Sequence, residues 1–219
     1  MKKSCCGMLW DTLVSMFQMM YARIRFLSFN KPIVTIFGGH RLTERKQQLR
    51  KDINEIAYQL ASCDLMIMTG GGGGIMAEAH RGACRVNQDK GPVAIGISVK
   101  ALNEPRGQIG CKDRLYLTVH TLFARKWILM RFSHVFFFFP GGFGTLDEFM
   151  EVMTLLKLDR MDKRKIVLYN KAYWQGFLAW AQKELVDSEF SYAEEMKYFI
   201  LVDSVQEAVA ELKQCCGCV

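Results

Sequence analysis

From Ile33 onward, the chain alternates short apolar runs with Gly-rich or polar turns and longer stretches of helical periodicity. Several apolar runs contain no polar position, which is typical of strands covered on both faces. This alternation predicts an α/β fold: a Rossmann-like, doubly wound, mainly parallel sheet covered by helices on both faces. The expected strands are Ile33–Phe37, Leu65–Thr69, Val93–Val99, Val135–Phe139, Ile166–Tyr169 and Phe199–Val202.

Between these runs, apolar residues recur at three- and four-residue spacing, as helices require. The expected helices are Glu44–Ala61, Ile75–Val86, Leu122–Ser133, Leu146–Leu158, Tyr173–Leu185 and Val205–Lys213. No linker or repeat interrupts the pattern, so residues 32–213 are expected to form a single domain. Residues 1–31 are an N-terminal apolar helical extension, and residues 214–219 are a Cys-rich tail.

The N-terminal extension combines a basic start with an apolar stretch. Asp11, Gln18, Arg23 and Arg25 interrupt it, so it lacks the run of about 20 apolar residues that a membrane-spanning helix needs. No small-x-small cleavage site follows, and we expect a cytoplasmic protein. The segment is expected to be a helix laid on the domain or on a partner, with attachment to a membrane surface as the alternative. Because no motif described below begins before Ile33, the first 29 residues are expected to be dispensable for the chemistry.

The 219 residues carry 29 Lys+Arg against 22 Asp+Glu, a formal charge of +7. This excess suits an anionic ligand, a nucleic acid or an acidic membrane, but equally a solvated basic face. No interleaved aromatic and basic motif supports nucleic-acid binding, which we do not expect. Outside the C-terminal tail the Cys form no C-x-x-C pair, and the four His have no ligand spacing, so neither a metal nor another cofactor is expected.

Three expected strands end in glycine, at IFGGHR (36–41), MTGGGGG (68–74) and FPGGFGT (139–145). Such loops lie together at the carboxyl edge of a parallel sheet, where ligands bind. Glycine lets backbone N–H groups approach a ligand, and the following helix adds its positive end, so the expected guest is a phosphate. Neither a Walker P-loop nor a dinucleotide fingerprint fits the spacing. A mononucleotide or a sugar phosphate fits better.

The helix expected from Leu146 carries apolar residues on two sides. Leu146, Phe149, Met150 and Met153 form one stripe, which is expected to face the sheet. Glu148 lies nearly opposite, in line with Val152 and Leu155. A second apolar stripe indicates packing against another subunit, with Glu148 in a cleft near that interface. The alternative is that Asp147 and Glu148 are first-turn acids favoured by the helix dipole.

The sequence PGGFGTLDE at 140–148, the upstream pair Arg125-Lys126 and the block TGGGGGIM at 69–76 together resemble the motifs of the lonely-guy (LOG) family of nucleoside 5′-monophosphate phosphoribohydrolases. The resemblance covers about residues 32 to 212 and is closest to the bacterial branch often mislabelled lysine decarboxylase. It implies a Rossmann-like fold, a homodimer or a higher assembly of dimers, and hydrolysis of the N-glycosidic bond of AMP or a cytokinin ribotide. No lysine lies in a recognisable pyridoxal-phosphate setting.

The resemblance also implies roles for individual residues. The glutamate of the PGG motif and the arginine of the Arg-Lys pair are catalytic in that family, which points to Glu148 and Arg125 here. Such a carboxylate can stabilise a cationic ribose or activate water, while a cation offsets charge on the leaving base. The implied substrate-binding residues are Gly38, Gly71, Gly72, Gly74, Met76, Lys126, Gly141, Gly142, Gly144 and Thr145.

Two positions depart from the family pattern. After Gly38 and Gly39 the first loop reads His40-Arg41, where relatives usually carry a serine after glycine, and Arg41 is expected to supply charge to the phosphate instead. His80 stands where relatives often have asparagine and bears on base or ribose contacts. Two alternatives remain open: the cations of the Arg-Lys pair lie on an outer helix face, or the protein carries a nucleotide or phosphorylated cofactor without cleaving it.

Overall fold

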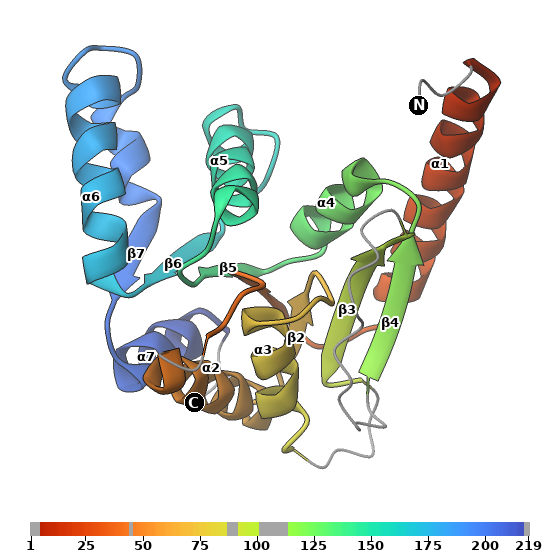
Figure 1. The fold of residues 1–219 in the computed structure, drawn as a ribbon, viewed down its shortest axis with the longest axis horizontal. Coiled ribbons are helices and arrows are strands. Elements are labelled where there is room, and N and C mark those ends of the chain that lie inside the picture. Colours follow the sequence, from red (N-terminus) through yellow and green to blue (C-terminus); the bar gives the residue numbers. More distant parts are fainter. Residues whose placement is uncertain (1–4, 44–45, 87–91, 101–113, 217–219) are drawn as a thin grey trace.

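The computed structural model describes residues 5–43, 46–86, 92–100 and 114–216. Its strands form one seven-stranded sheet in the order β4-β3-β2-β1-β5-β6-β7, and every neighbouring pair runs parallel (Figure 1). This confirms the α/β, Rossmann-like prediction. The strands are β1 (Ile33–Phe37), β2 (Met66–Thr69), β3 (Ala94–Val99), β4 (Arg114–Val119), β5 (Val135–Phe138), β6 (Lys165–Tyr169) and β7 (Phe199–Val202).

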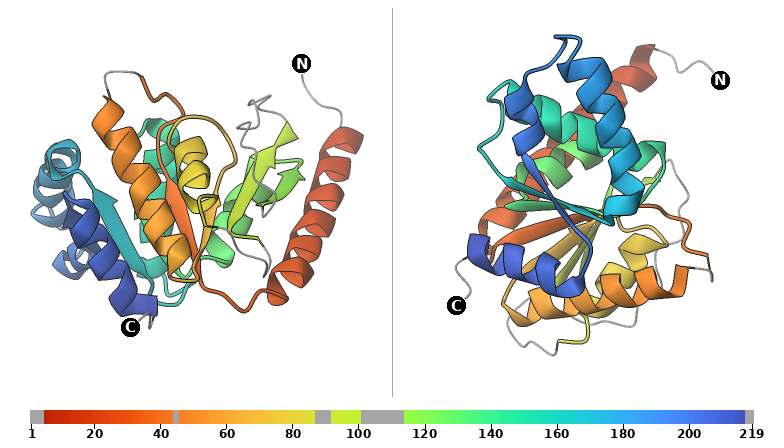
Figure 2. Two further views of the ribbon diagram at one scale, coloured as in Figure 1. Left: turned by 90° about the horizontal axis from the view of Figure 1, so that it is seen from below. Right: turned by 90° about the vertical axis from the view of Figure 1, so that its left-hand side faces the viewer.

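Helices cover both faces of the sheet (Figure 2). One face carries α1 (Cys5–Leu27), α4 (Leu122–Arg131), α5 (Phe143–Lys157) and α6 (Lys171–Ala181). The other carries α2 (Gln47–Ser62), α3 (Ile75–Ala83) and α7 (Val205–Cys216). A π-helical turn at Gln182–Val186 prolongs α6, and a 3-10 turn at Ala193–Lys197 precedes β7. Each helical layer encloses its own hydrophobic core against the sheet.

The six expected strands are present with each end within one residue of its predicted place, but β4 was not predicted. This strand lies at the edge of the sheet, and the side chains of Arg114 to Leu117 are only half-buried. It therefore alternates apolar and polar positions, unlike the continuous apolar runs of the inner strands. A search for uninterrupted apolar runs misses such a strand.

The orientation predicted for α5 was right only in part: Phe149 is buried as expected, but so is Val152, which was expected on the outer stripe. The helix begins at Phe143, three residues before the expected start, and its buried residues are Thr145, Phe149, Val152 and Leu156. Met150, which was expected to face the sheet, is 41% exposed. Both stripes have helical spacing, so the sequence alone could not decide which of them faces the sheet. In the structure, the large ring of Phe149 packs against Phe138 and Trp174 and lies close to the centre of the buried face.

Several other helix ends also differ from expectation: α3 ends at Ala83, three residues before the expected Val86, and α4 ends at Arg131, two residues before the expected Ser133. The helix α7 continues to Cys216 and so includes the first three residues of the predicted Cys-rich tail, while residues 217–219 lie outside the described part of the chain. The expected start of α2 at Glu44 also lies outside it.

The N-terminal segment forms α1, which packs on the β4–α4 region. This agrees with the expectation of a helix laid on the domain. Ala22 and Phe26 are buried in the hydrophobic core of that layer. Ser15 Oγ lies 2.9 Å from Thr121 Oγ1, and the backbone N–H of His120 donates to Gln18 Oε1 at 2.8 Å. Within the described ranges, no helix is long and apolar enough to cross a membrane.

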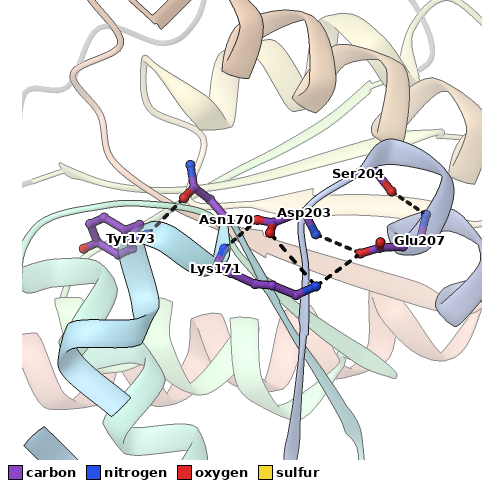
Figure 3. Close-up of polar contacts among 6 residues, drawn as sticks. All are labelled: Asn170, Lys171, Tyr173, Asp203, Ser204 and Glu207. Atoms are coloured by element: carbon purple, nitrogen blue, oxygen red, sulfur yellow. Dashed lines mark hydrogen bonds and ion pairs between the residues drawn. The ribbon is translucent and has the colours of Figure 1, made fainter. Parts of the chain in front are cut away.

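Local hydrogen bonds fix the starts of α6 and α7 at the carboxyl ends of β6 and β7 (Figure 3). Asn170, whose φ is 79°, caps α6 by accepting a hydrogen bond from Tyr173 N at 3.0 Å. Ser204 Oγ accepts from Glu207 N at 3.1 Å, a typical helix cap. Tyr173 also donates from its hydroxyl to the carbonyl of Gly141 at 2.8 Å. This contact anchors the loop after β5, which forms part of the site described next.

Candidate active site

A hollow of about 320 Å³ lies at the carboxyl edge of the sheet, above β1, β2 and β5. The chain order of the strands reverses between β1 and β5, and ligands of open α/β sheets bind at such a point. The loop after β1 is held to the loop after β5 by a hydrogen bond from Gly39 N to Pro140 O at 3.1 Å. The hollow is lined by Ile36, Phe37, Gly38, Gly39, His40, Gly70, Met76, Leu122, Arg125, Lys126, Gly142, Phe143, Gly144, Thr145, Asp147 and Glu148.

Arg125 enters this hollow from α4, whose first turn is capped by the Thr121 side chain accepting from Ala124 N. Its side chain runs directly over Gly70, so closely that a Cβ on that glycine would overlap Nη2. Arg125 is only 8% exposed, and among the described residues its Nε has no hydrogen-bond partner. Its Nη2 donates a long hydrogen bond to Met76 Sδ, at 3.9 Å. A buried guanidinium in such surroundings is suited to an anionic ligand group.

The N-terminus of α5 faces the same hollow. Gly142 precedes the helix, and no side chain caps the helix start. The carbonyl of Gly142 accepts from Thr145 N and Leu146 N, so Phe143 and Gly144 supply the first amides of the helix toward the hollow. Free amides and the positive end of a helix dipole together favour an anion. Glu148, half-buried, lies one turn further on in the pocket wall.

Lys126 also lines the hollow, but two carboxylates hold its charge. Its Nζ lies 2.8 Å from Asp147 Oδ2 and pairs with Glu151 as well. Burial alone lowers the pKa of Lys126, but the hydrogen bonds and charges of these carboxylates outweigh burial and raise it. Asp147 therefore has a structural partner on α4 and is more than a first-turn acid.

The glycines after β2 behave differently from those after β5. Gly71 has a φ of 74°, and its N–H donates to Thr69 Oγ1 at 3.0 Å. Its carbonyl accepts from the Tyr116 hydroxyl of β4. Gly74 has a φ of 61°, and a Cβ there would overlap the carbonyls of Gly39 and His40. These glycines allow two loops and a tyrosine ring to pack closely.

His80 belongs to the core beneath that loop. It is 1% exposed, and its Nε2 lies 3.0 Å from Thr69 Oγ1 and 3.2 Å from the carbonyl of Ile95. Burial lowers the pKa of His80 to about 4, against a hydrogen bond to Ile95 that acts in the opposite direction. A neutral His80 thus links α3, β2 and β3 and lies outside the lining of the hollow, which argues against the predicted contact with base or ribose.

Comparisons with known proteins agree with these motifs. A family model described as possible lysine decarboxylase matches residues 76–212, more than half of the chain. Curated relatives of the chain bear the name cytokinin riboside 5′-monophosphate phosphoribohydrolase. The chain belongs to the LOG family.

Two LOG-family relatives from plants align over most of both chains. A protein of Arabidopsis thaliana is 27% identical over 165 residues, covering 75% of this chain and 74% of the relative. One of Oryza sativa subsp. japonica is 28% identical over 173 residues, covering 78% and 68%. The match to a protein of Mycobacterium marinum is 34% identical over 97 residues but spans only 44% of this chain and 51% of that relative.

Solved structures show the same fold. The molybdenum cofactor carrier protein of Chlamydomonas reinhardtii superposes with a TM-score of 0.58 at 22% identity, covering 85% of this chain and 98% of that one. The molybdenum cofactor binding protein of Rippkaea orientalis superposes with a TM-score of 0.59 at 19% identity, with the same coverage. At these identities the likeness shows the fold alone.

The structure of this LOG-family chain brings eight of the predicted site residues together. The hollow is lined by Gly38, Met76, Arg125, Lys126, Gly142, Gly144, Thr145 and Glu148. Five others lie outside its lining: Arg41, Gly71, Gly72, Gly74 and Gly141. Arg41 is exposed, Gly71 and Gly72 are buried, and a Cβ on Gly141 would overlap the Thr145 side chain, so this glycine makes room for the threonine.

Sequence reasoning did not single out Gly70, Leu122 or Phe143 as lining residues. Gly70 belongs to the quoted glycine run, and Leu122 and Phe143 adjoin or interrupt quoted motifs, so proximity in sequence was the available signal. Tyr116 supports the site from the unpredicted strand β4 and carried no such signal. Across the described ranges, His, Cys, Asp and Glu form no group of three or more that could hold a metal ion.

Proposed function

We propose that this protein hydrolyses the N-glycosidic bond of a nucleoside 5′-monophosphate, of the AMP or cytokinin ribotide type, to a free base and ribose 5-phosphate. One observation carries the proposal: the Glu148 carboxylate, the buried Arg125 guanidinium and the open amides of α5 all face one hollow. A carboxylate, a cation and an anion cradle are what this substrate needs. The names of the curated relatives support the same reaction.

In this reaction the phosphate binds the first amides of α5, where the helix dipole favours it. As the bond from C1′ to the base nitrogen breaks, positive charge develops on the ribose ring, and Glu148 stabilises it and removes a proton from the attacking water. The bonding electron pair leaves with the base, where Arg125 offsets the negative charge until the base nitrogen takes up a proton. The water oxygen becomes the hydroxyl on C1′.

Lys126 has a supporting role in this scheme. Because Asp147 and Glu151 hold it and its pKa is raised, its amine keeps its proton and is unsuited to forming an imine. The pocket lysine therefore favours hydrolysis over the decarboxylation named in the family description.

The decisive test compares AMP with adenosine at equal concentration, with free adenine and ribose 5-phosphate as the measured products. Because the cradle at α5 is built for an anion, AMP should be cleaved and adenosine hardly at all. Equal turnover of both would contradict the phosphate site. AMP that binds without cleavage would instead favour a carrier of nucleotides or phosphorylated cofactors.

Glu148→Gln tests the chemistry, because it keeps the shape of the side chain and removes its charge. The kcat for AMP should fall by about 10² to 10⁴, while AMP affinity stays level or rises. Asp147→Asn is the matched control. It lies on a more exposed part of the same turn, and Lys126 keeps Glu151 as a partner, so kcat should change by less than about fivefold. Similar losses in both variants would point to a folding effect.

We further propose that the active form is a homodimer or a higher assembly of dimers. Phe143, at the mouth of the hollow, is 92% exposed, and Leu122 of its lining is 51% exposed. Phe123 on α4 and Met150 on α5 are exposed as well. Large apolar side chains gathered at a site rim favour burial by another subunit. Sedimentation at low concentration tests this: an active monomer would show that the rim needs no cover.

A further inference from the structure

The outer face of α1 is apolar and exposed from Leu9 to Leu27. Nine large apolar side chains on it are each more than half exposed to solvent: Leu9, Trp10, Leu13, Met16, Phe17, Met20, Tyr21, Ile24 and Leu27. Folding does not need them there, because the opposite face of α1 makes the contacts that hold the helix, through Ser15, Ala22 and Phe26. An exposed apolar face of this size favours burial against another surface.

Helical geometry places these nine side chains on a continuous arc of about 140°, at about 100° per residue. Arg23 and Arg25, both exposed, project on either side of that arc. Acidic residues are nearly lacking: Asp11 is the only acid of α1, and it pairs with His120 at 2.9 Å. An apolar arc bordered by cations is typical of helices that lie in a membrane interface.

More cations gather where α1 ends. A hollow of about 590 Å³ there is lined by Arg23, Lys31, Arg131, Lys163 and Arg164, with Asp162 as its one acid. Arg23 lies on α1, Lys31 before β1, Arg131 at the end of α4, and Lys163 and Arg164 between α5 and β6. Lys31 is paired with Asp64 at 2.6 Å, so the other four cations carry the basic surface, which belongs to the folded domain and continues the charged border of the helix.

We propose that α1 docks this protein on an anionic phospholipid bilayer, with the helix lying parallel to the surface. The apolar arc would enter the boundary between headgroups and acyl chains, and the basic surface would contact lipid phosphates. A second copy fits less well, because the sequence places Lys2 and Lys3 ahead of α1 and Arg23 and Arg25 near its end. Pairing two such helices in either direction sets cations against cations.

Flotation of the full chain with vesicles tests this. Wild-type protein should float with phosphatidylcholine vesicles containing about a third phosphatidylglycerol, and much less with pure phosphatidylcholine. Phe17→Glu combined with Ile24→Glu should reduce binding by at least about tenfold, since both side chains lie on the exposed arc. Phe190→Glu, an exposed apolar residue remote from α1 in sequence, is the matched control and should bind as wild type. Circular dichroism and AMP turnover check that each variant is folded.

Charge and depth are tested separately. Arg23→Ala with Arg25→Ala should weaken binding to the anionic vesicles by roughly tenfold or more, and added salt should do the same. Trp10 fluorescence should shift to shorter wavelength on binding, and Trp10→Phe should remove that shift. The proposal is overturned if both vesicle types bind equally or neither binds. It is also overturned if Phe17→Glu with Ile24→Glu abolishes self-association in vesicle-free solution, because the arc would then belong to a second copy.

Discussion

Two glycine-rich loops meet at the carboxyl edge of the sheet, and they use glycine in opposite ways. In the loop after β2, a Cβ on Gly70, Gly71 or Gly74 would collide with Arg125, with Tyr116 or with backbone carbonyls. In the loop after β5, a Cβ on Gly142 or Gly144 would meet nothing within 4 Å. The first loop is glycine-rich because protein fills the space around it. In the second, Gly141 likewise makes room for the Thr145 side chain, but Gly142 and Gly144 stand where space is left for a ligand.

This difference shows that the number of glycines does not measure contact with phosphate. The longer run, five glycines from Gly70 to Gly74, contributes only Gly70 to the lining of the pocket. Its main effect is indirect, because it lets the Arg125 guanidinium reach the pocket while buried. Substitutions in the two loops should therefore fail in different ways.

The largest effect is expected from Gly70→Ala. Its methyl group would displace the Arg125 side chain, so kcat for AMP should fall by about 10² or more, and the free energy of unfolding should fall by about 1–3 kcal/mol. Steady-state kinetics and urea unfolding measure the two changes. If turnover stays normal, the position of Arg125 over Gly70 is not needed for the reaction.

The second largest effect is expected from acid, which should lower the stability of the protein through His80, beneath the loop after β2. His80 in the folded protein has its pKa lowered by burial to about 4, below the ordinary value of 6.5, so between these values only the unfolded chain takes up the proton. Stability is therefore complete above pH 6.5 and falls as the pH drops toward 4, by about 3 kcal/mol in total at a slope near 1.4 kcal/mol per pH unit.

Urea unfolding between pH 4.5 and 7 measures this slope. The control is His80→Gln, whose amide can still donate to Ile95 but does not titrate, so its slope should be smaller. Burial also lowers the pKa of His134, but that residue is present in both proteins, so its share cancels. Equal slopes would show that His80 is not the group responsible.

The smallest effect is expected from Gly144→Ala, in the glycine-rich segment after β5. An added methyl group has room in the unliganded protein, so the melting temperature should hold or rise slightly, as alanine favours a helix over glycine. The methyl group would narrow the approach to the first amides of α5, so KM for AMP should rise about tenfold with kcat nearly unchanged. An unchanged KM would place the phosphate elsewhere.

The fold was predictable because the inner strands are apolar throughout and each is followed by a helical period. The edge strand β4 and the buried face of α5 were not. An edge strand carries a mixed pattern, and α5 offers two stripes of similar spacing, between which only its three-dimensional neighbours decide. These neighbours come from distant parts of the chain, so the local sequence pattern does not identify them.

The candidate site was predictable in its motifs and less so in its supports. Glu148, Arg125 and the glycines at the start of α5 stand in recognisable motifs and share one pocket. The tasks of Gly71 and His80 depend on Tyr116 and on Ile95, respectively, which lie 45 and 15 residues away. Contacts of this kind make glycine or histidine necessary for packing while resembling ligand contacts in the sequence.

The surface on which α1 packs is synthesised long after α1 itself. Its hydrogen-bond partners Thr118, His120 and Thr121 follow it by 100 to 106 residues. At about 5–20 residues per second, the ribosome finishes α1 roughly 5–20 s before that seat exists. During this interval the nascent chain exposes both the inner and the outer side of the helix. A nearby bilayer can therefore engage α1 before the domain that it will tether has been made.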